Sequence, residues 1–211
     1  LKTLPKGTLV VLTSDHGVSH SPAELAQLRI QGGTFRSSAL KAALESKLTE
    51  KLGGGPYVDE VMGQGIYLRP GPKPAKDEAL LRQAVLETLS ELPWSEHFSG
   101  AVFASDLREG RFPEGVLGKQ LRNTFGEKFP DVFGILRPYH YEVGKDLVNH
   151  MTGLAYDRTI PILISGPGIR KGVFPGGRAV DIAPTLSFLL GVIPPAFSEG
   201  QVLGEALDLK K

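Results

Sequence analysis

Two continuous apolar runs, at 8–14 and 159–165, have the pattern of buried β-strands. Both runs are rich in β-branched and aliphatic residues and carry no charge, which is typical of strands covered on both faces of a parallel sheet. Between them, apolar residues recur at helical spacing in several segments, as at Leu40, Leu44 and Leu48. The pattern therefore predicts a sheet layer interrupted by a long insertion.

The insertion alternates between helical and strand-like segments, which predicts a small α+β unit over 37–137. The segment 18–36 has no clear periodicity and is expected to be irregular, and the proline-rich run 70–74 is expected to be a stiff connector. A last helix is expected to begin at Asp181 and to end before Gly191. The insertion's expected helices are 38–52, 76–92 and 116–129, and its expected strands are two within 57–68, then 98–104 and 131–136.

Composition removes several classes of function. The chain has 211 residues, a net charge of +1 and no cysteine. A nearly neutral chain offers no strong field for nucleic acid or an anionic membrane. No apolar run approaches the length of about 18 residues that spans a bilayer. The missing cysteines exclude disulfides, thiolate zinc sites and cysteine nucleophiles.

The clearest chemical signal is Asp15-His16-Gly17, directly after the first apolar run. The ends of strands are where open α/β sheets place their chemistry. An oxygen ligand beside a nitrogen ligand suits zinc or manganese. The two side chains can share one ion if the chain bends at Gly17, or each can bind a different ion of a two-metal site.

Three further residues are candidates for the same site. His150 lies in a loop just before the second apolar run, and Asp157 follows it. Asp157 is a candidate carboxylate that accepts the second ring N–H of a ligand histidine, or else a turn residue before the strand. His20 is close enough in sequence to His16 to reach a substrate cleft. His97 and His140 are expected to be structural or exposed.

Several catalytic motifs are absent from the sequence. There is no glycine-rich phosphate loop ending in Lys-Ser or Lys-Thr, no Gly-x-Ser-x-Gly turn and no His-Glu-x-x-His helix.

Three segments together resemble the alkaline phosphatase superfamily, in particular its single-domain alkaline phosphatase and type I phosphodiesterase branch. The strand that ends in Asp15-His16-Gly17 resembles the superfamily's metal-binding strand end. His150 followed by Tyr156-Asp157 and Ile160-Pro161 resembles its late histidine motif. The segment 181–192 resembles its final helix. The late motif differs in one respect, because Met151 follows the histidine and the glycine is delayed to position 153.

The resemblance implies a phosphate-ester hydrolase with two zinc ions rather than manganese. Asp15 and His16 would bind the ion that activates the nucleophile, and His150 would bind the ion at the leaving group. Segments 1–36 and 138–211 would form the C-terminal part of the α/β hydrolytic core, with the insert 37–137 as a cap. A periplasmic or extracellular location is favoured.

The same resemblance implies that part of the enzyme lies outside this chain. Superfamily members carry an earlier half that supplies a Thr or Ser nucleophile, another metal-binding Asp and an Asp-x-x-x-His pair, and none of these has a counterpart here. We therefore expect a C-terminal fragment that needs its N-terminal half, acts on small phosphate esters and is inactive alone.

Other functions remain open at this stage. A sulfatase, a nucleotide pyrophosphatase and a cofactor-independent phosphoglycerate mutase, which would prefer manganese, all share the Asp-His motif. A non-catalytic domain that kept the fold and binds a ligand or partner is the alternative from a different class.

Overall fold

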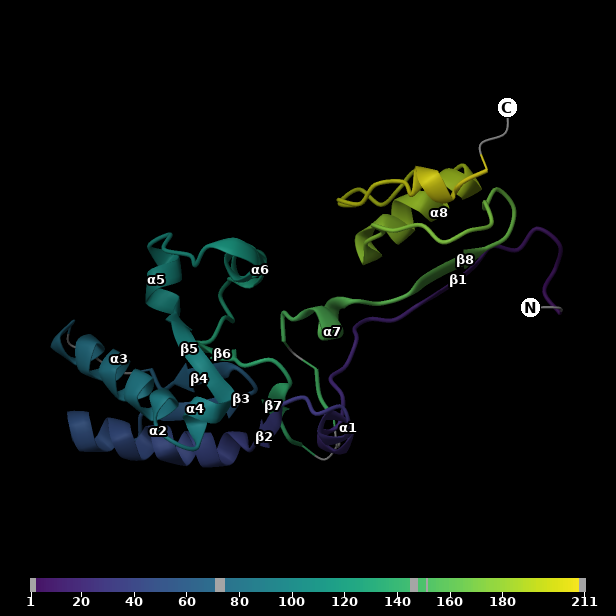
Figure 1. The fold of residues 1–211 in the computed structure, drawn as a ribbon. Coiled ribbons are helices and arrows are strands. Elements are labelled where there is room, and N and C mark those ends of the chain that lie inside the picture. The colour runs from purple at the N-terminus through teal and green to yellow at the C-terminus, as the bar shows by residue number, and fades with distance from the viewer. Residues whose placement is uncertain (1–2, 71–74, 145–147, 151, 209–211) are drawn as a thin grey trace. The chain divides into compact units, whose positions relative to one another are not determined.

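A computed structural model of the chain describes residues 3–70, 75–144, 148–150 and 152–208. The chain forms two compact units (Figure 1). Unit 1 consists of Leu1–Asp15 and Ile160–Lys211, and unit 2 consists of His16–Thr159. Unit 2 extends at both ends beyond the insert 37–137 that the sequence pattern outlines. Among the described residues, no helix is both long and apolar enough to cross a membrane.

Unit 1 is built on a two-stranded sheet. Strand β1 (Val10–Thr13) pairs with β8 (Ile162–Ser165) in antiparallel register, with Val10 opposite Ser165. Both strands were predicted, but the parallel sheet and the burial on both faces were not found, since β1 and β8 pair with each other and leave apolar side chains exposed. Three helical segments complete the unit: η1 (Ala179–Asp181), α8 (Ile182–Leu190) and η2 (Gly204–Ala206).

Helix α8 ends as its sequence predicts but begins differently. Gly191 adopts the left-handed conformation that closes a helix. Asp181 was expected to cap α8, yet its side chain makes no capping bond to that helix. Its carboxylate instead accepts hydrogen bonds from the backbone N–H groups of Arg178 and Gln201 and from the Arg178 guanidinium. These contacts hold the pKa of Asp181 at about 2.

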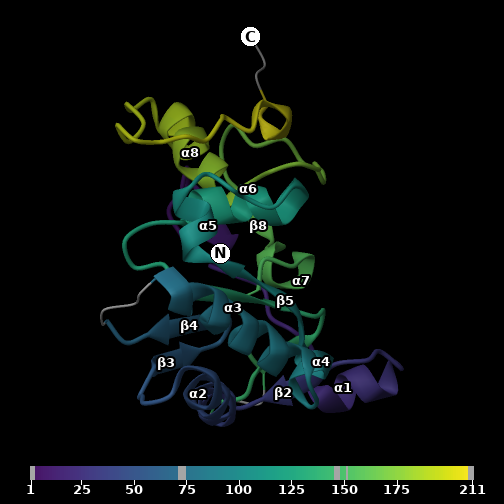
Figure 2. The ribbon, with the colours of Figure 1, turned by 90° about the vertical axis from the view of Figure 1, so that its left-hand side faces the viewer.

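Unit 2 contains a four-stranded antiparallel sheet in the order β3-β4-β6-β5. Helices α2 and α3 lie on one side of the sheet, and α5 and α6 lie on the other (Figures 1 and 2). The bounds are β3 (Val58–Met62), β4 (Gly65–Leu68), β5 (Phe98–Phe103), β6 (Val132–Leu136), α2 (Ser37–Leu52), α3 (Ala75–Ser90), α5 (Ala104–Arg108) and α6 (Gly115–Thr124).

Side chains of β6 point alternately to the two faces of this sheet and pack in different apolar clusters. Val132 and Leu136 belong to the larger apolar cluster, which includes the fully buried Leu40, Leu44 and Leu48 of α2. Phe133 and Ile135 belong instead to the smaller cluster with α5 and α6. The period of two along a strand places neighbouring residues on opposite faces, and burial of each leucine stabilises the unit by about 1.5–3 kcal/mol.

Short elements complete unit 2 around this sheet. Strands β2 (Gly33–Phe35) and β7 (His140–Glu142) form a separate parallel pair. The remaining helices are α1 (Pro22–Gln27), α4 (Trp94–His97) and α7 (Ala155–Arg158).

The helices and strands expected within 38–136 are confirmed, with shifts at their ends. The third helix stops at Thr124 rather than 129, because Phe125 already has an extended backbone. The segment 18–36, expected to be irregular, contains α1 and β2. Ser21 and Glu24 form a reciprocal capping box around Pro22, a helix-start signal that the short apolar pattern did not reveal. Most of the expected connector 70–74 lies outside the described residues.

Candidate functional site

The imidazole rings of His16 and His150 stack on each other, although the two residues are far apart in sequence. Their centroids are 3.5 Å apart and their planes are inclined by 18°. Both residues belong to unit 2. The chain therefore brings together two of the three residues predicted as metal ligands.

A backbone contact fixes the proton position on His16. Its Nδ1 lies 2.7 Å from the carbonyl oxygen of Gly17. A carbonyl can only accept, so Nδ1 carries the proton and donates. In the neutral ring the lone pair is then on Nε2, which is the nitrogen suited to bind a metal.

Gly17 joins the His16 segment to the segment that follows His150. Its N–H donates to the carbonyl oxygen of Asp157 at 2.8 Å. A Cβ at this position would lie 2.0 Å from the Tyr156 carbonyl oxygen. Gly17 does not have a positive φ, so glycine is needed here because two backbone segments approach closely. The bend expected at Gly17 is therefore not what requires glycine there.

Asp157 closes the turn between His150 and α7. Its carboxylate is buried, and Oδ2 accepts hydrogen bonds from the N–H and the hydroxyl of Thr152 at 2.8 and 2.6 Å. The other oxygen, Oδ1, is buried and has no hydrogen-bond partner among the described residues. Because an unpaired buried oxygen is costly, Oδ1 is suited to accept an N–H from a group that the site binds or orients.

The segment containing His150 is anchored on both sides. The His150 N–H donates to the Asn149 side chain, which in turn donates to the carbonyl oxygen of Glu142 in β7. The Gln120 side chain of α6 donates to the Gly153 carbonyl oxygen at 2.7 Å. The ordered elements of unit 2 thus hold this loop by its backbone.

Two stacked tyrosines lie next to the same loop. The rings of Tyr139 and Tyr156 stack with centroids 4.7 Å apart, and the Tyr139 N–H donates to the Tyr156 hydroxyl oxygen. Burial raises the pKa of Tyr156, which keeps its hydroxyl neutral.

Asp15 and His20 complete the set of predicted site residues. Asp15 follows β1 as the last residue of the first segment of unit 1, and Ser14 Oγ donates to its Oδ1 at 3.3 Å. His20 is largely exposed, and its Nδ1 lies 3.9 Å from the Glu24 carboxylate at the start of α1.

The remaining histidines lie in a different cluster of unit 2. His140 is buried in β7, and its ring packs edge-on against that of His97 at 5.3 Å. Phe35 also contacts His97. Burial, with a contribution from His140, lowers the pKa of His97. His97 ends α4 immediately before β5.

The described residues near the two stacked histidines offer metal-binding donor types but too few of them for a complete site. Within the described ranges, no group of three or more His, Asp or Glu side chains is placed to hold a metal ion. Two imidazoles side by side, one with its Nε2 lone pair defined, are donors that zinc accepts, but zinc needs three or four ligands. The residues present therefore fit zinc as a partial ligand set.

The residues that support the loop around His150 could not be recognised from the sequence. Thr152, Asn149 and Gln120 gave no signal, since each is a common polar residue whose role comes from tertiary contacts. Tyr156 was noticed only as part of a motif.

Three known proteins are similar to this chain over more than nine-tenths of its length. No family model matches the chain. It is 25% identical over 216 residues to alkaline phosphatase PafA of Elizabethkingia meningoseptica, covering 98% of this chain and 38% of that protein. It is 27% identical to alkaline phosphatase PhoV of Synechococcus elongatus, covering 98% and 37%. A protein of Myroides odoratus named calcium-transporting ATPase is 26% identical, covering 93% and 36%.

A solved structure of PafA has the same fold over this region. The TM-score is 0.77 at 25% sequence identity, and the match covers 98% of this chain and 39% of that chain. This chain therefore spans well under half the length of the relatives it matches, and it corresponds to their C-terminal portion.

Proposed function

We propose that this chain, which is similar to alkaline phosphatases over nearly all its length, is a member of the alkaline phosphatase superfamily and forms the C-terminal part of a zinc-dependent phosphate-ester hydrolase. The observation that carries the proposal is the contact between the His16 and His150 rings. The sequence resemblance named these two histidines as metal ligands, and the fold brings them together.

Asp15 and His16 would hold one zinc ion and His150 a second. The two ions would supply Lewis-acid polarisation of the phosphate ester. The chain's own residues fix the donors: the Gly17 carbonyl selects the His16 tautomer, and the Asp157–Thr152 contacts shape the turn after His150. Asp157 is a positioning residue in this scheme, with Oδ1 available to a ligand N–H.

The nucleophile and the remaining ligands would come from polypeptide outside this chain. The relatives extend well beyond the matched region, and a site with three ligands for two ions is incomplete. We infer that the functional protein continues on the N-terminal side of residue 1. The substrate would be a small phosphate ester, and His20 is a candidate contact at the edge of its cleft.

The first test replaces His16 in that longer protein. His16→Ala should remove about one zinc equivalent, measured by elemental analysis. Replacing a residue that only orients a ligand costs about 10–100-fold, so loss of the ligand itself should lower hydrolysis of p-nitrophenyl phosphate by more than that.

The control is Lys128→Ala, an exposed position in the loop after α6, which should leave zinc content and hydrolysis unchanged. The 211-residue chain alone should show no hydrolysis above background. Normal zinc content and turnover in His16→Ala would remove the assigned role. A wild-type longer protein without bound zinc would favour a non-catalytic binding domain.

A further inference from the structure

Unit 1 exposes apolar side chains that a self-contained unit would bury. Among its described residues, Leu207 is the only buried large hydrophobic side chain, whereas unit 2 has two apolar clusters. Leu12 on β1 is 63% exposed, and Leu163 on β8 is 55% exposed. A two-stranded sheet is marginal in water without a covered face. The sheet of unit 1 therefore lacks a covering layer.

Helix α8 shows an inverted burial pattern. The polar Thr185 is buried, where its hydroxyl donates to the Asp181 carbonyl oxygen and accepts from the Leu203 N–H. By contrast, Phe188 is 54% exposed and Leu190 is 63% exposed. Removing apolar area from water is favourable, so a partner that covers this face would stabilise unit 1.

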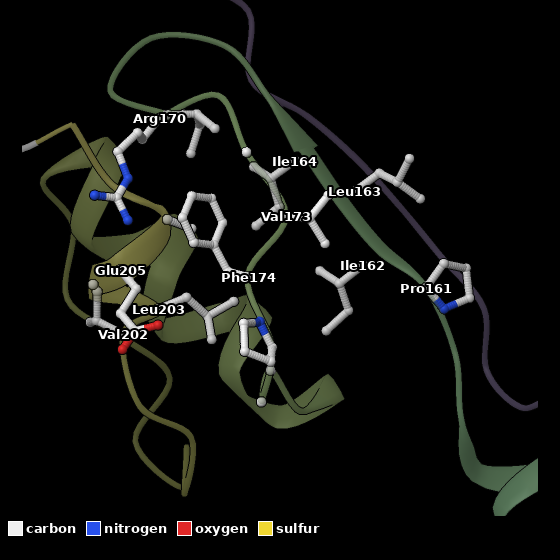
Figure 3. A pocket seen from close by; sticks show the side chains of 17 residues that line it. Pro161, Ile162, Leu163, Ile164, Arg170, Val173, Phe174, Val202, Leu203 and Glu205 are labelled. Carbon is white, nitrogen blue, oxygen red and sulfur yellow. The ribbon is translucent and has the colours of Figure 1, made fainter.

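A cavity of about 620 Å³ lies beside β8, within unit 1 (Figure 3). Side chains of β8, of the loop 169–177 and of the segment 202–206 surround it. Apolar surface comes from Ile162, Phe174 and Leu203. The Arg170 guanidinium stacks over the Phe174 ring, with its central carbon 4.7 Å from the ring centroid. The lining is suited to apolar side chains.

We propose that this apolar surface of unit 1 is the docking surface for the part of the same polypeptide that lies outside this chain. The surface comprises Leu12, Leu163, Phe188, Leu190 and the cavity beside β8. The proposal rests on the proposed function, because the occupant is the N-terminal portion of that hydrolase.

Two observations favour this occupant over a second copy of the chain. The fold of 98% of the chain is kept in a solved alkaline phosphatase chain of which it is only 39%, so most of that larger protein is available to cover it. In the described part of the chain, β1 and β8 each pair only with the other, and an unpaired edge offers backbone donors and acceptors to further strands. The N-terminal portion could cover the exposed apolar side chains and also add strands to the unpaired edges of β1 and β8.

The absence of cysteine allows a direct test by thiol labelling. Leu12→Cys, Leu163→Cys and Leu190→Cys probe the surface, and Leu92→Cys, exposed in unit 2, is the matched control. In the 211-residue chain, all four thiols should react with a maleimide at similar rates. In the longer protein, the three probes should react at least about tenfold more slowly, with the control unchanged.

Each other outcome counts against the proposal. Equal labelling in the longer protein would overturn it. Protection in the 211-residue chain that rises with concentration, together with sedimentation as a dimer, would assign the surface to a second copy. Undiminished binding of an apolar fluorescent dye by the longer protein would show that the cavity stays open to small molecules.

The same preparations separate this inference from the proposed function. Hydrolysis of p-nitrophenyl phosphate without thiol protection would refute the docking surface alone. Protection without hydrolysis or bound zinc would refute the proposed function and leave the docking surface standing.

Discussion

Individual residues of the candidate site act mainly through backbone contacts. Gly17 donates to Asp157, and Asp157 in turn accepts from Thr152, so a continuous set of hydrogen bonds links the segments that carry His16 and His150. The two imidazoles stack where these contacts bring the segments together. The position of His16 relative to His150 therefore depends on groups that bind no metal themselves.

Gly17 gives the sharpest prediction at this scale. Gly17→Ala would place a methyl group against the Tyr156 carbonyl oxygen, and forcing extra volume into a packed site costs about 1–3 kcal/mol. We expect the free energy of unfolding of unit 2, from urea denaturation, to fall by that amount.

Gly126→Ala is the matched control, since a Cβ there meets nothing within 4 Å. If both variants unfold at the same urea concentration, the close approach at Gly17 is not a constraint on the fold.

At the scale of elements, α2 shows how much a helical pattern determines. Leu40, Leu44 and Leu48 recur at helical spacing in the sequence, and all three are fully buried against the sheet and α3. The helix therefore contributes one apolar stripe to the main core of unit 2. The position of α8 also follows from the sequence, but the exposure of its apolar side chains does not.

Leu44→Ala tests the contribution of α2 to the core. Removing a fully buried leucine side chain costs about 2–5 kcal/mol, and we expect a loss of that size in the unfolding free energy of unit 2. Leu86→Ala on the exposed side of α3 is the comparison and should change it by less than about 1 kcal/mol. Similar losses in both variants would show that burial in α2 does not stabilise the unit as assigned.

At the scale of the whole molecule, the two units differ in how much apolar surface each buries. As far as the structure describes the two units, both hydrophobic clusters lie in unit 2 and none lies in unit 1. Local stability follows buried apolar contacts. We therefore expect the two units of the isolated chain to open independently and with different free energies.

Hydrogen–deuterium exchange of the 211-residue chain measures this difference directly. Amides of β5 and β6 in unit 2 should be strongly protected, whereas those of β1 and β8 should exchange orders of magnitude faster. The β5 and β6 amides serve as the internal reference, since both pairs are antiparallel ladders. Equal protection in the two sheets would show that unit 1 is stable without a covering partner.

The sequence by itself determined the positions of most helices and strands of unit 2, because each carries its own apolar period or ends at a glycine. It also identified Asp15 and His16 as candidate ligands, since residue type and place after a strand are local properties, and the family resemblance added His150. It did not reveal α1 or the short pair β2–β7, whose segments are too brief for a period to stand out.

Only the tertiary structure decided that His16 and His150 meet, that β1 pairs with β8, and that the apolar strands of unit 1 remain exposed. An apolar run predicts that a strand will be covered, but it does not identify the covering segment, because burial depends on the partner as much as on the strand. In the same way, the sequence shows a glycine at position 17 after the Asp-His pair. Only the close approach of the Tyr156 carbonyl shows why no side chain fits there.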